Sequence, residues 1–246
     1  MERRDFLKTA GGLVLAGASC AVAGRFLTAT YGVKASAGDL TSVRRWGMVI
    51  DLTKCLPGCT ACLKACREEN NVAFLGDKRY DVHWIRKVGL KSESDHHAPE
   101  RPMLLLCNHC ENPPCAQVCP VQATYKRHDG IVIVDHHRCI GCRYCMVACP
   151  YNARYFNFKE DEEWHNKEFP KRSHGVAEAC TLCAHRLDRS EKPACVEACE
   201  NINANVLHVG DLNDAESAVS RLIAGTPTKR LRPDLGTDPK VYYIGL

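Results

Sequence analysis

Sixteen of the seventeen cysteines in this 246-residue chain fall into four groups of four, and this clustering limits the possible folds more than any other feature. The groups are Cys55, Cys59, Cys62 and Cys66; Cys107, Cys110, Cys115 and Cys119; Cys139, Cys142, Cys145 and Cys149; and Cys180, Cys183, Cys195 and Cys199. Cysteines so close along a chain are usual for thiolates that share a metal centre. The chain is therefore expected to fold around these centres and to unfold when the metal is lost.

The third group has the most informative spacing. It reads C-x2-C-x2-C-x3-C and is followed directly by Pro150, which is the run that holds cubane iron-sulfur clusters in bacterial ferredoxins. Sixteen thiolates can hold four 4Fe-4S clusters, and the sequence predicts four. Groups one and four are less regular, because an additional residue separates Cys55 from Cys59 and eleven residues separate Cys183 from Cys195. One of these sites could accordingly hold a 3Fe-4S cluster instead.

The fourth cysteine of each group is expected to bind the cluster of a partner group, as it does in two-cluster ferredoxins. Groups two and three are close in sequence and both end in Cys-Pro, so we pair them, and we pair group one with group four. The predicted ligand sets are set 1, Cys55, Cys59, Cys62 and Cys199; set 2, Cys66, Cys180, Cys183 and Cys195; set 3, Cys107, Cys110, Cys115 and Cys149; and set 4, Cys119, Cys139, Cys142 and Cys145.

Zinc binding and a disulfide framework are the two alternatives to iron-sulfur ligation. Zinc is often held by paired C-x2-C elements, but these do not account for groups that end in x3-Cys. Disulfides form in oxidising compartments, yet the cysteines of a disulfide framework are usually scattered along the chain. The spacing favours iron-sulfur clusters, with a zinc- or disulfide-stabilised structural protein as the remote alternative. His109 and His185, beside the cysteines, are expected to be structural or to donate hydrogen bonds near the clusters.

The N-terminal residues have the pattern of an export signal. Arg3 and Arg4 precede Phe6-Leu7-Lys8 in a twin-arginine signature, and a short Gly- and Ala-rich apolar stretch follows. Twin-arginine export carries folded proteins, so clusters inserted before transport are compatible with an oxidising destination. The chain is therefore expected on the periplasmic side. Cys20 lies in this signal, so we exclude it from the ligands. Lipidation of Cys20 is not expected, because Gly17 stands where a lipidation signal requires Leu.

Two segments look like copies of one unit. Val49–Cys55 and Ile133–Cys139 each read as a short strand, an aspartate, a basic residue and a cysteine loop. Apolar runs predict β-strands at Met48–Ile50 and Ile131–Val134, and a helix is expected over Leu63–Glu69, after the first cysteine loop. We therefore predict an α+β protein with a duplicated bacterial-ferredoxin-like fold.

The order of these features suggests three segments. They are an N-terminal signal segment at residues 1–37, a four-cluster ferredoxin-like domain at residues 38–200, and a C-terminal extension at residues 201–246. In the domain, the two cysteine groups at residues 107–149 are expected to form one two-cluster module, and the groups at 55–66 and 180–199 are expected to form the other. The extension is expected to contain a helix over Asp214–Ala224, followed by an extended tail.

Loop insertions at residues 72–100 and 151–176 contain Trp84 and Trp164. Each insertion is a candidate partner-binding surface or a cover for the clusters. The formal net charge of +4 does not include the clusters, each of which carries about two negative charges with its four thiolates when oxidised. The excess of Lys and Arg is therefore interpreted as compensation for buried negative charge, and no nucleic-acid partner is expected.

From about residue 45 to residue 245, the chain resembles the four-cluster ferredoxin-like subunits of membrane oxidoreductases, the dimethyl sulfoxide reductase electron-transfer subunit family. Besides the cysteine groups, the resemblance rests on three strings: CNHCENPPC from Cys107, CIGCRYCMVACPY from Cys139, and PKVYYI from Pro239. It implies the same pairing of groups. Within the family, the chain is similar to the periplasmic iron-sulfur subunit of the Dsr membrane complex associated with sulfite reductase.

The resemblance implies an electron-transfer subunit of a hetero-oligomeric complex of respiration and sulfur metabolism. Its clusters would connect an integral membrane quinone-interacting subunit with a multihaem cytochrome. The alternative second partner is a molybdopterin catalytic subunit of a tetrathionate, polysulfide or dimethyl sulfoxide enzyme, or a component of a nitrite-reduction or hydrogenase-2 system. The C-terminal sequence has no apolar span, so membrane association is expected through the partners. Without a phosphate-binding loop or hydrolytic triad, no catalytic site is expected in this chain.

Overall fold

The computed structural model describes residues 43–91, 97, 99–160 and 163–246, and Val43–Leu246 form one compact unit. The signal segment at residues 1–37 and Cys20 therefore lie outside the described residues. The unit contains both helices and strands, and several strands follow one another as antiparallel hairpins, which confirms the α+β class. Within the described ranges, no helix has both the length and the apolar character that a membrane span requires.

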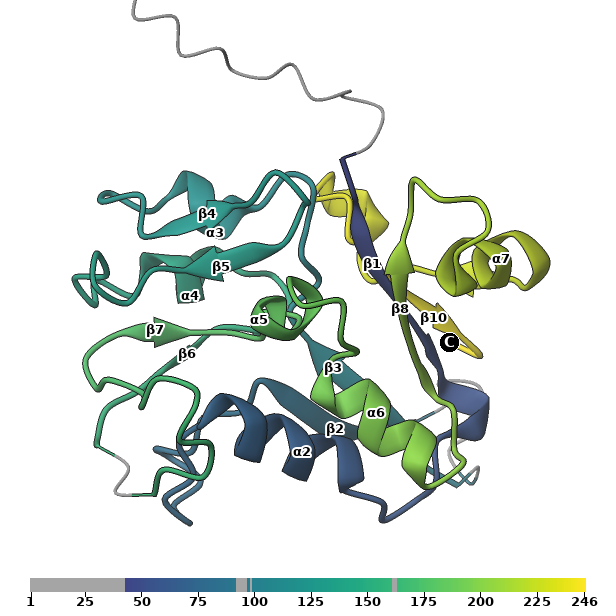
Figure 1. Cartoon of the computed structure of the whole chain (residues 1–246), viewed down its shortest axis with the longest axis horizontal. Helices are drawn as coiled ribbons and strands as arrows, with labels where there is room; N and C mark the ends of the chain where they lie inside the picture. Colours follow the sequence, from purple (N-terminus) through teal and green to yellow (C-terminus); the bar gives the residue numbers. More distant parts are fainter. Residues whose placement is uncertain (1–42, 92–96, 98, 161–162) are drawn as a thin grey trace, which may run out of the picture. The chain divides into compact units, whose positions relative to one another are not determined.

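A four-stranded sheet joins the start of the described chain to its end (Figure 1). Its strands, in spatial order, are β8 (Leu207–Asp211), β1 (Trp46–Asp51), β10 (Val241–Ile244) and β9 (Thr228–Lys229). Strand β1 is parallel to β10, with Met48 opposite Val241, and antiparallel to β8. The C-terminal extension at residues 201–246 thus provides the other three strands of the sheet, with β8 and β10 on either side of β1 and β9 beyond β10.

Strand β1 is buried on both of its faces. On one face, Val49 and Ile244 pack against Val219 of α7 (Ala218–Gly225), and on the other, Met48 belongs to the main core. Coverage of both faces explains the nearly continuous apolar run in β1, because neither face can carry polar side chains at low cost.

Helix α7 begins four residues later than the predicted start at Asp214. Ser217 adopts an extended conformation, and its hydroxyl accepts a hydrogen bond from the Ser220 backbone N–H at 3.1 Å. A serine in this geometry satisfies one of the free N–H groups at a helix start. Asp214 lies before the cap, where its carboxylate accepts from the Glu216 N–H instead.

Three antiparallel hairpins complete the strand set. They are β2 (Ile85–Leu90) with β3 (Arg101–Leu106), β4 (Thr124–Lys126) with β5 (Val132–Val134), and β6 (Tyr155–Phe156) with β7 (Ala177–Glu178). The first predicted insertion contains β2, and Trp84 beside it is only 3% exposed. Trp84 is therefore part of the core and not of a partner-binding surface, whereas Trp164 is 39% exposed.

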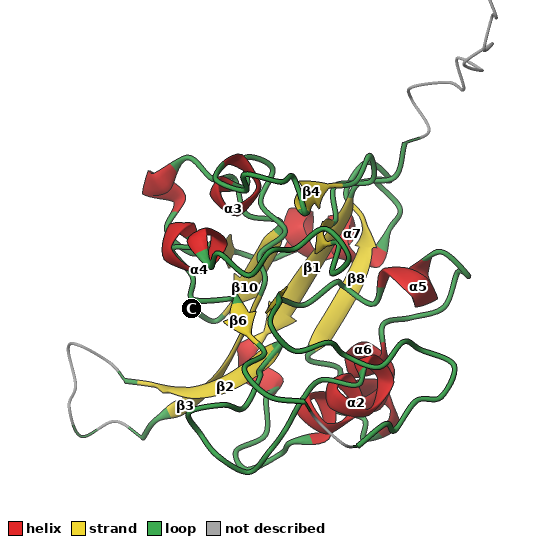
Figure 2. Cartoon of the chain, turned by 90° about the vertical axis from the view of Figure 1, so that its left-hand side faces the viewer, coloured by secondary structure: helices red, strands yellow, loops and turns green. Residues whose placement is uncertain are grey.

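The helices beside the cysteines form two pairs. Helix α2 (Ala61–Asn70), which includes the helix predicted at 63–69, packs against α6 (Ala194–Asn201). Helix α3 (Pro114–Gln117) packs against α4 (Tyr144–Ala148). Figure 1 and Figure 2 show the two pairs in different parts of the unit, with α5 (Ala184–Leu187) as a further short helix. These contacts join group one to group four and group two to group three.

The two segments that resemble each other in sequence share a local structure. Asp51, at the end of β1, accepts a hydrogen bond from the N–H two residues later at 3.1 Å, and Asp135, after β5, does the same at 2.9 Å. Each carboxylate also lies near a basic residue three positions on, Lys54 at 3.0 Å and Arg138 at 4.0 Å. In both cases the turn leads directly into the first cysteine of a group. The 3-10 helices η2 (Leu52–Lys54) and η3 (Pro233–Leu235) are the remaining elements.

Candidate iron-sulfur sites

Groups one and four bring their cysteines together across the α2–α6 contact. Burial raises the pKa of Cys62 to about 11, and the charges of the other three set 1 thiols contribute to this increase. Burial also raises the pKa of Cys66 well above its ordinary value, assisted by the charges of all three remaining set 2 thiols. Like charges and loss of solvent both disfavour the thiolate form. Cys199 thus lies near Cys55 and Cys62 of group one, and Cys66 lies near the first three cysteines of group four.

Groups two and three meet in the same way. Burial raises the pKa of Cys110 to about 11, and the nearby thiols of Cys115 and Cys149 raise it too. The four set 4 thiols line one small hollow, together with neighbouring residues such as Ile140, Arg143 and Ala177. All sixteen described cysteines are free thiols. Within the described residues, no three His, Cys, Asp or Glu side chains are grouped as ligands of a single metal ion would be.

Thiols of different sets also approach one another at three junctions. The junctions join Cys62 to Cys66, Cys107 to Cys180, and Cys115 to Cys145. They connect set 1 to set 2, set 2 to set 3, and set 3 to set 4. The sets therefore form a series through the unit in the order 1, 2, 3, 4.

The ends of this series lie nearer the surface than its middle. All four cysteines of set 2 are buried, as are three of set 3. In set 1, Cys55 and Cys59 are partly exposed, and in set 4, Cys142 is exposed. Water therefore has least access to the middle of the series, and a second protein could approach closest at its two ends.

Each set has a nitrogen donor within hydrogen-bonding distance of a sulfur. The donors are Val206 N to Cys199 (3.3 Å), Leu182 N to Cys180 (3.3 Å), Arg154 Nη2 to Cys115 (3.2 Å), Thr124 N to Cys119 (3.4 Å) and Ala177 N to Cys139 (3.5 Å). Donors of this kind stabilise a thiolate and tune the reduction potential of iron-sulfur centres. At Cys119 burial favours the neutral thiol, but the surrounding backbone N–H groups outweigh it and lower the pKa.

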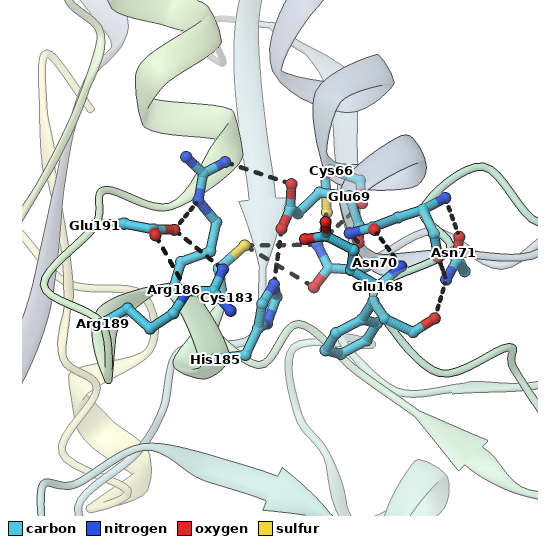
Figure 3. Close-up of polar contacts among 12 residues, drawn as sticks. Cys66, Glu69, Asn70, Asn71, Glu168, Cys183, His185, Arg186, Arg189 and Glu191 are labelled. Atoms are coloured by element: carbon cyan, nitrogen blue, oxygen red, sulfur yellow. Dashed lines mark hydrogen bonds and ion pairs between the residues drawn. The ribbon is translucent and has the colours of Figure 1, made fainter.

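The end of α2 connects set 2 to its polar surroundings, as Figure 3 shows. The Asn70 side-chain amide donates to the Cys66 carbonyl at 3.0 Å and to the Cys183 sulfur at 3.5 Å. Glu69 accepts from Arg186 at 3.4 Å and pairs with His185 at 2.8 Å. Asn71 ends the helix in a left-handed conformation, and its side-chain amide donates to the carbonyls of Asn166 and Phe169, both at 2.9 Å. These contacts hold α5 and the 166–170 loop around set 2.

Several buried polar atoms beside the cysteines have no hydrogen-bond partner in the described part of the chain. They include both amide atoms of Asn108 and the Nε2 of His109, between Cys107 and Cys110, and the hydroxyl of Thr181. His109 Nδ1 accepts from Val132 N at 3.1 Å, so Nε2 carries the hydrogen of the neutral ring. Burial lowers the pKa of His109 to about 3. Buried unpaired donors normally have a partner. The sulfides of an iron-sulfur cluster would accept from the Asn108 amide nitrogen, His109 Nε2 and the Thr181 hydroxyl, so these donors fit the group.

Sequence reasoning did not identify Asn70, Arg154 or Lys240 as neighbours of the cysteines. Lys240 is 1% exposed, and its ammonium donates to Glu111 in the group two loop at 3.1 Å. Its backbone N–H donates to the Asn108 carbonyl at 2.9 Å, so the residue directly before β10 supports the loop that carries the set 3 cysteines. The only signal in the sequence was position, because Glu111 and Lys240 both lie in strings that carry the family resemblance.

Comparison with known proteins agrees with this geometry. Residues 103–211 match the 4Fe-4S dicluster domain. Over its full length, the chain is 41% identical to Hdr-like menaquinol oxidoreductase iron-sulfur subunit 1 of Archaeoglobus fulgidus and covers 98% of that protein. It is 43% identical to the putative dimethyl sulfoxide reductase iron-sulfur subunit of Halobacterium salinarum, over 81% of this chain and 78% of that protein. It is 39% identical to a tetrathionate reductase subunit of Salmonella typhimurium, over 82% of this chain and 73% of that protein.

The fold and the grouped cysteines define an iron-sulfur protein of the α+β class. The chain belongs to the family of electron-transfer iron-sulfur subunits of membrane-associated oxidoreductases, whose members include the three relatives above. This membership confirms iron-sulfur clusters as the cofactor, and the zinc or disulfide scaffold is not supported.

Proposed function

We propose that this chain holds four 4Fe-4S clusters in sets 1 to 4 and carries single electrons between a quinone-interacting membrane subunit and a second redox subunit. The observation that carries the proposal is the series of four thiol sets, joined at three junctions, with partly exposed cysteines at both ends. When bound, the clusters supply one-electron oxidation and reduction. No catalytic site of the chain's own is part of the proposal.

The residues around the sets have three tasks in this function. The cysteines provide thiolate ligands, the N–H donors hold negative charge at the sulfurs, and the surrounding core keeps water from sets 2 and 3. Fixed donors in a dry interior need little rearrangement when charge changes, which favours rapid transfer. In the proposed duplicated ferredoxin-like fold, the cysteine groups at residues 107–149 form one module, which holds sets 3 and 4. The groups at 55–66 and 180–199 form the other module, which holds sets 1 and 2.

The names of the relatives support a quinone on one side of the series. One relative is named as a subunit of a menaquinol oxidoreductase, and another, 38% identical, as the iron-sulfur cluster-binding subunit of a menaquinone reductase of Nitratidesulfovibrio vulgaris. On the other side, the names dimethyl sulfoxide reductase and tetrathionate reductase favour a terminal reductase over a Dsr-like complex. We therefore propose a molybdopterin catalytic subunit as the second partner, which was the alternative in the sequence-based interpretation.

A multihaem cytochrome as second partner is the other candidate. It is favoured by the full-length match, because that relative is named for its quinol and not for a terminal substrate. In either complex we propose a location on the periplasmic side, reached by twin-arginine export, with membrane association through the partner subunits.

Gentle solubilisation of membranes and capture of this chain tests the partner assignment. The captured complex would be analysed by mass spectrometry and for haem and molybdenum. A stoichiometric molybdopterin subunit with a polytopic membrane protein is the expected result, and a multihaem cytochrome without molybdenum would select the second candidate. Electron transfer through the clusters is tested on the isolated chain. It should bind about sixteen iron atoms and give 4Fe-4S electron paramagnetic resonance (EPR) signals on reduction. A fully iron-loaded chain without such signals would contradict electron transfer.

A further inference from the structure

A buried guanidinium lies at the junction of sets 3 and 4. Arg154 is 4% exposed, and its Nη2 donates to the Cys115 sulfur of set 3 at 3.2 Å. Its Nη1 donates to the Thr124 hydroxyl at 3.1 Å, and the Thr124 backbone N–H in turn donates to the Cys119 sulfur of set 4 at 3.4 Å. Arg154 therefore contacts one set directly and reaches the next through a single residue.

Cysteine thiols supply the leading charges around Arg154. Those that act on it most are Cys115, Cys107, Cys145 and Cys149. Three of these belong to set 3 and one to set 4. Arginine remains protonated in proteins, so this site has a permanent positive charge in a dry interior, where Coulomb interactions are stronger than in water.

Set 2 also has an arginine nearby, but its charge is opposed. Arg172 lies near Cys66 and Cys183, and its Nε donates to the Asn70 carbonyl at 2.7 Å. The carboxyl group of Glu178, which is fully buried and accepts from Trp84 Nε1 at 3.1 Å, acts on the same guanidinium. The two arginines are thus in different situations: a carboxyl group is the leading charge that acts on Arg172, whereas cysteine ligands are the leading charges that act on Arg154.

We propose that Arg154 sets the reduction potential of the set 3 centre, raising it above the value that the same ligands would give alone, with a smaller effect at set 4. Reduction adds one electron from a partner subunit and therefore one negative charge, while no bond forms or breaks and no proton is needed. The guanidinium stabilises that added charge. The inference depends on the proposed electron-transfer function.

The test is an EPR-monitored redox titration of the iron-loaded full chain. Arg154→Gln should shift one of the one-electron transitions to lower potential by at least tenfold in its equilibrium constant, which is about 59 mV. Arg154→Lys, which keeps the charge, should retain most of the wild-type potential. Arg138→Gln is the control, because Arg138 precedes a set 4 ligand but its side chain is 62% exposed, and water screens such a charge. It should leave every transition within twofold of wild type.

A second variant tests the same charge while Arg154 is kept. Thr124→Asp puts a carboxyl group in place of the hydroxyl that accepts from Arg154 Nη1, and it should shift the same transition in the same direction. EPR reports only loaded centres, so partial iron loss in one variant does not prevent the measurement. Unchanged potentials in both Arg154→Gln and Thr124→Asp, or an equal shift in Arg138→Gln, would overturn the role of Arg154. Absence of reducible signals in the wild-type chain would instead overturn the proposed function.

Discussion

Replacement of Tyr243 by Phe tests how firmly the C-terminal strand is joined to the rest of the unit. Tyr243 lies on β10 and is 1% exposed, and its hydroxyl donates to the Leu104 carbonyl of β3 at 3.1 Å. Leu104 is itself 1% exposed. The substitution keeps the ring and its packing but leaves the Leu104 carbonyl without this donor.

The expected cost follows from this geometry. A neutral hydrogen bond contributes about 0.5–1.5 kcal/mol net, and a buried acceptor left without a donor costs about 1–3 kcal/mol. We expect Tyr243→Phe to lower the free energy of unfolding by about 1–2 kcal/mol. For a domain of this size, about 1 kcal/mol corresponds to a change in Tm of about 2–4 °C, so Tm should fall by about 2–8 °C.

The assay is anaerobic thermal unfolding of the iron-loaded protein, followed by circular dichroism at one fixed scan rate. Tyr242→Phe is the matched control, because Tyr242 is the preceding residue on β10 and packs on the opposite face, with α7. It should change the free energy of unfolding by no more than about 0.5 kcal/mol. Equal Tm changes in the two variants would refute the reasoning, because the Tyr243 hydroxyl would then contribute nothing specific.

Four further predictions concern the sites and the fold. Cys55→Ala and Cys199→Ala should each remove about a quarter of the bound iron, and the double variant should lose no more than either alone; additive loss would contradict the assignment of both to set 1. Asn70→Leu should lower the potential of one EPR-detected transition, because a set 2 sulfur loses a donor. Ser217→Ala should cost about 1 kcal/mol in denaturant unfolding, while Asp214→Asn should cost less than about 0.5. Removal of iron with a chelator should abolish the native circular dichroism spectrum, and its retention would show a core independent of the metal.

The class of protein could be predicted from the sequence because cysteine spacing is local information. Ligands separated by two or three residues must share one loop, so the chain carries the geometry of each site in its order of residues. The strands at 48–50 and 131–134 and the helix at 63–69 are likewise local patterns, and the structure has elements at all three places. The start of α7 was predicted wrongly because a polar turn before the helix has the same composition as a first helical turn.

Only the tertiary structure determined the contacts between residues that are far apart in the sequence. The parallel pairing of Met48 with Val241 places the C-terminal residues beside β1, and no short pattern identifies the partner of a buried strand. The same is true of the neighbours of the cysteines: Arg154 beside Cys115, and Lys240 beside Glu111. Spacing determines which thiolates can form a site, whereas the charges and donors that act on the site depend on packing, because electrostatic interactions follow distance in space and not distance along the chain.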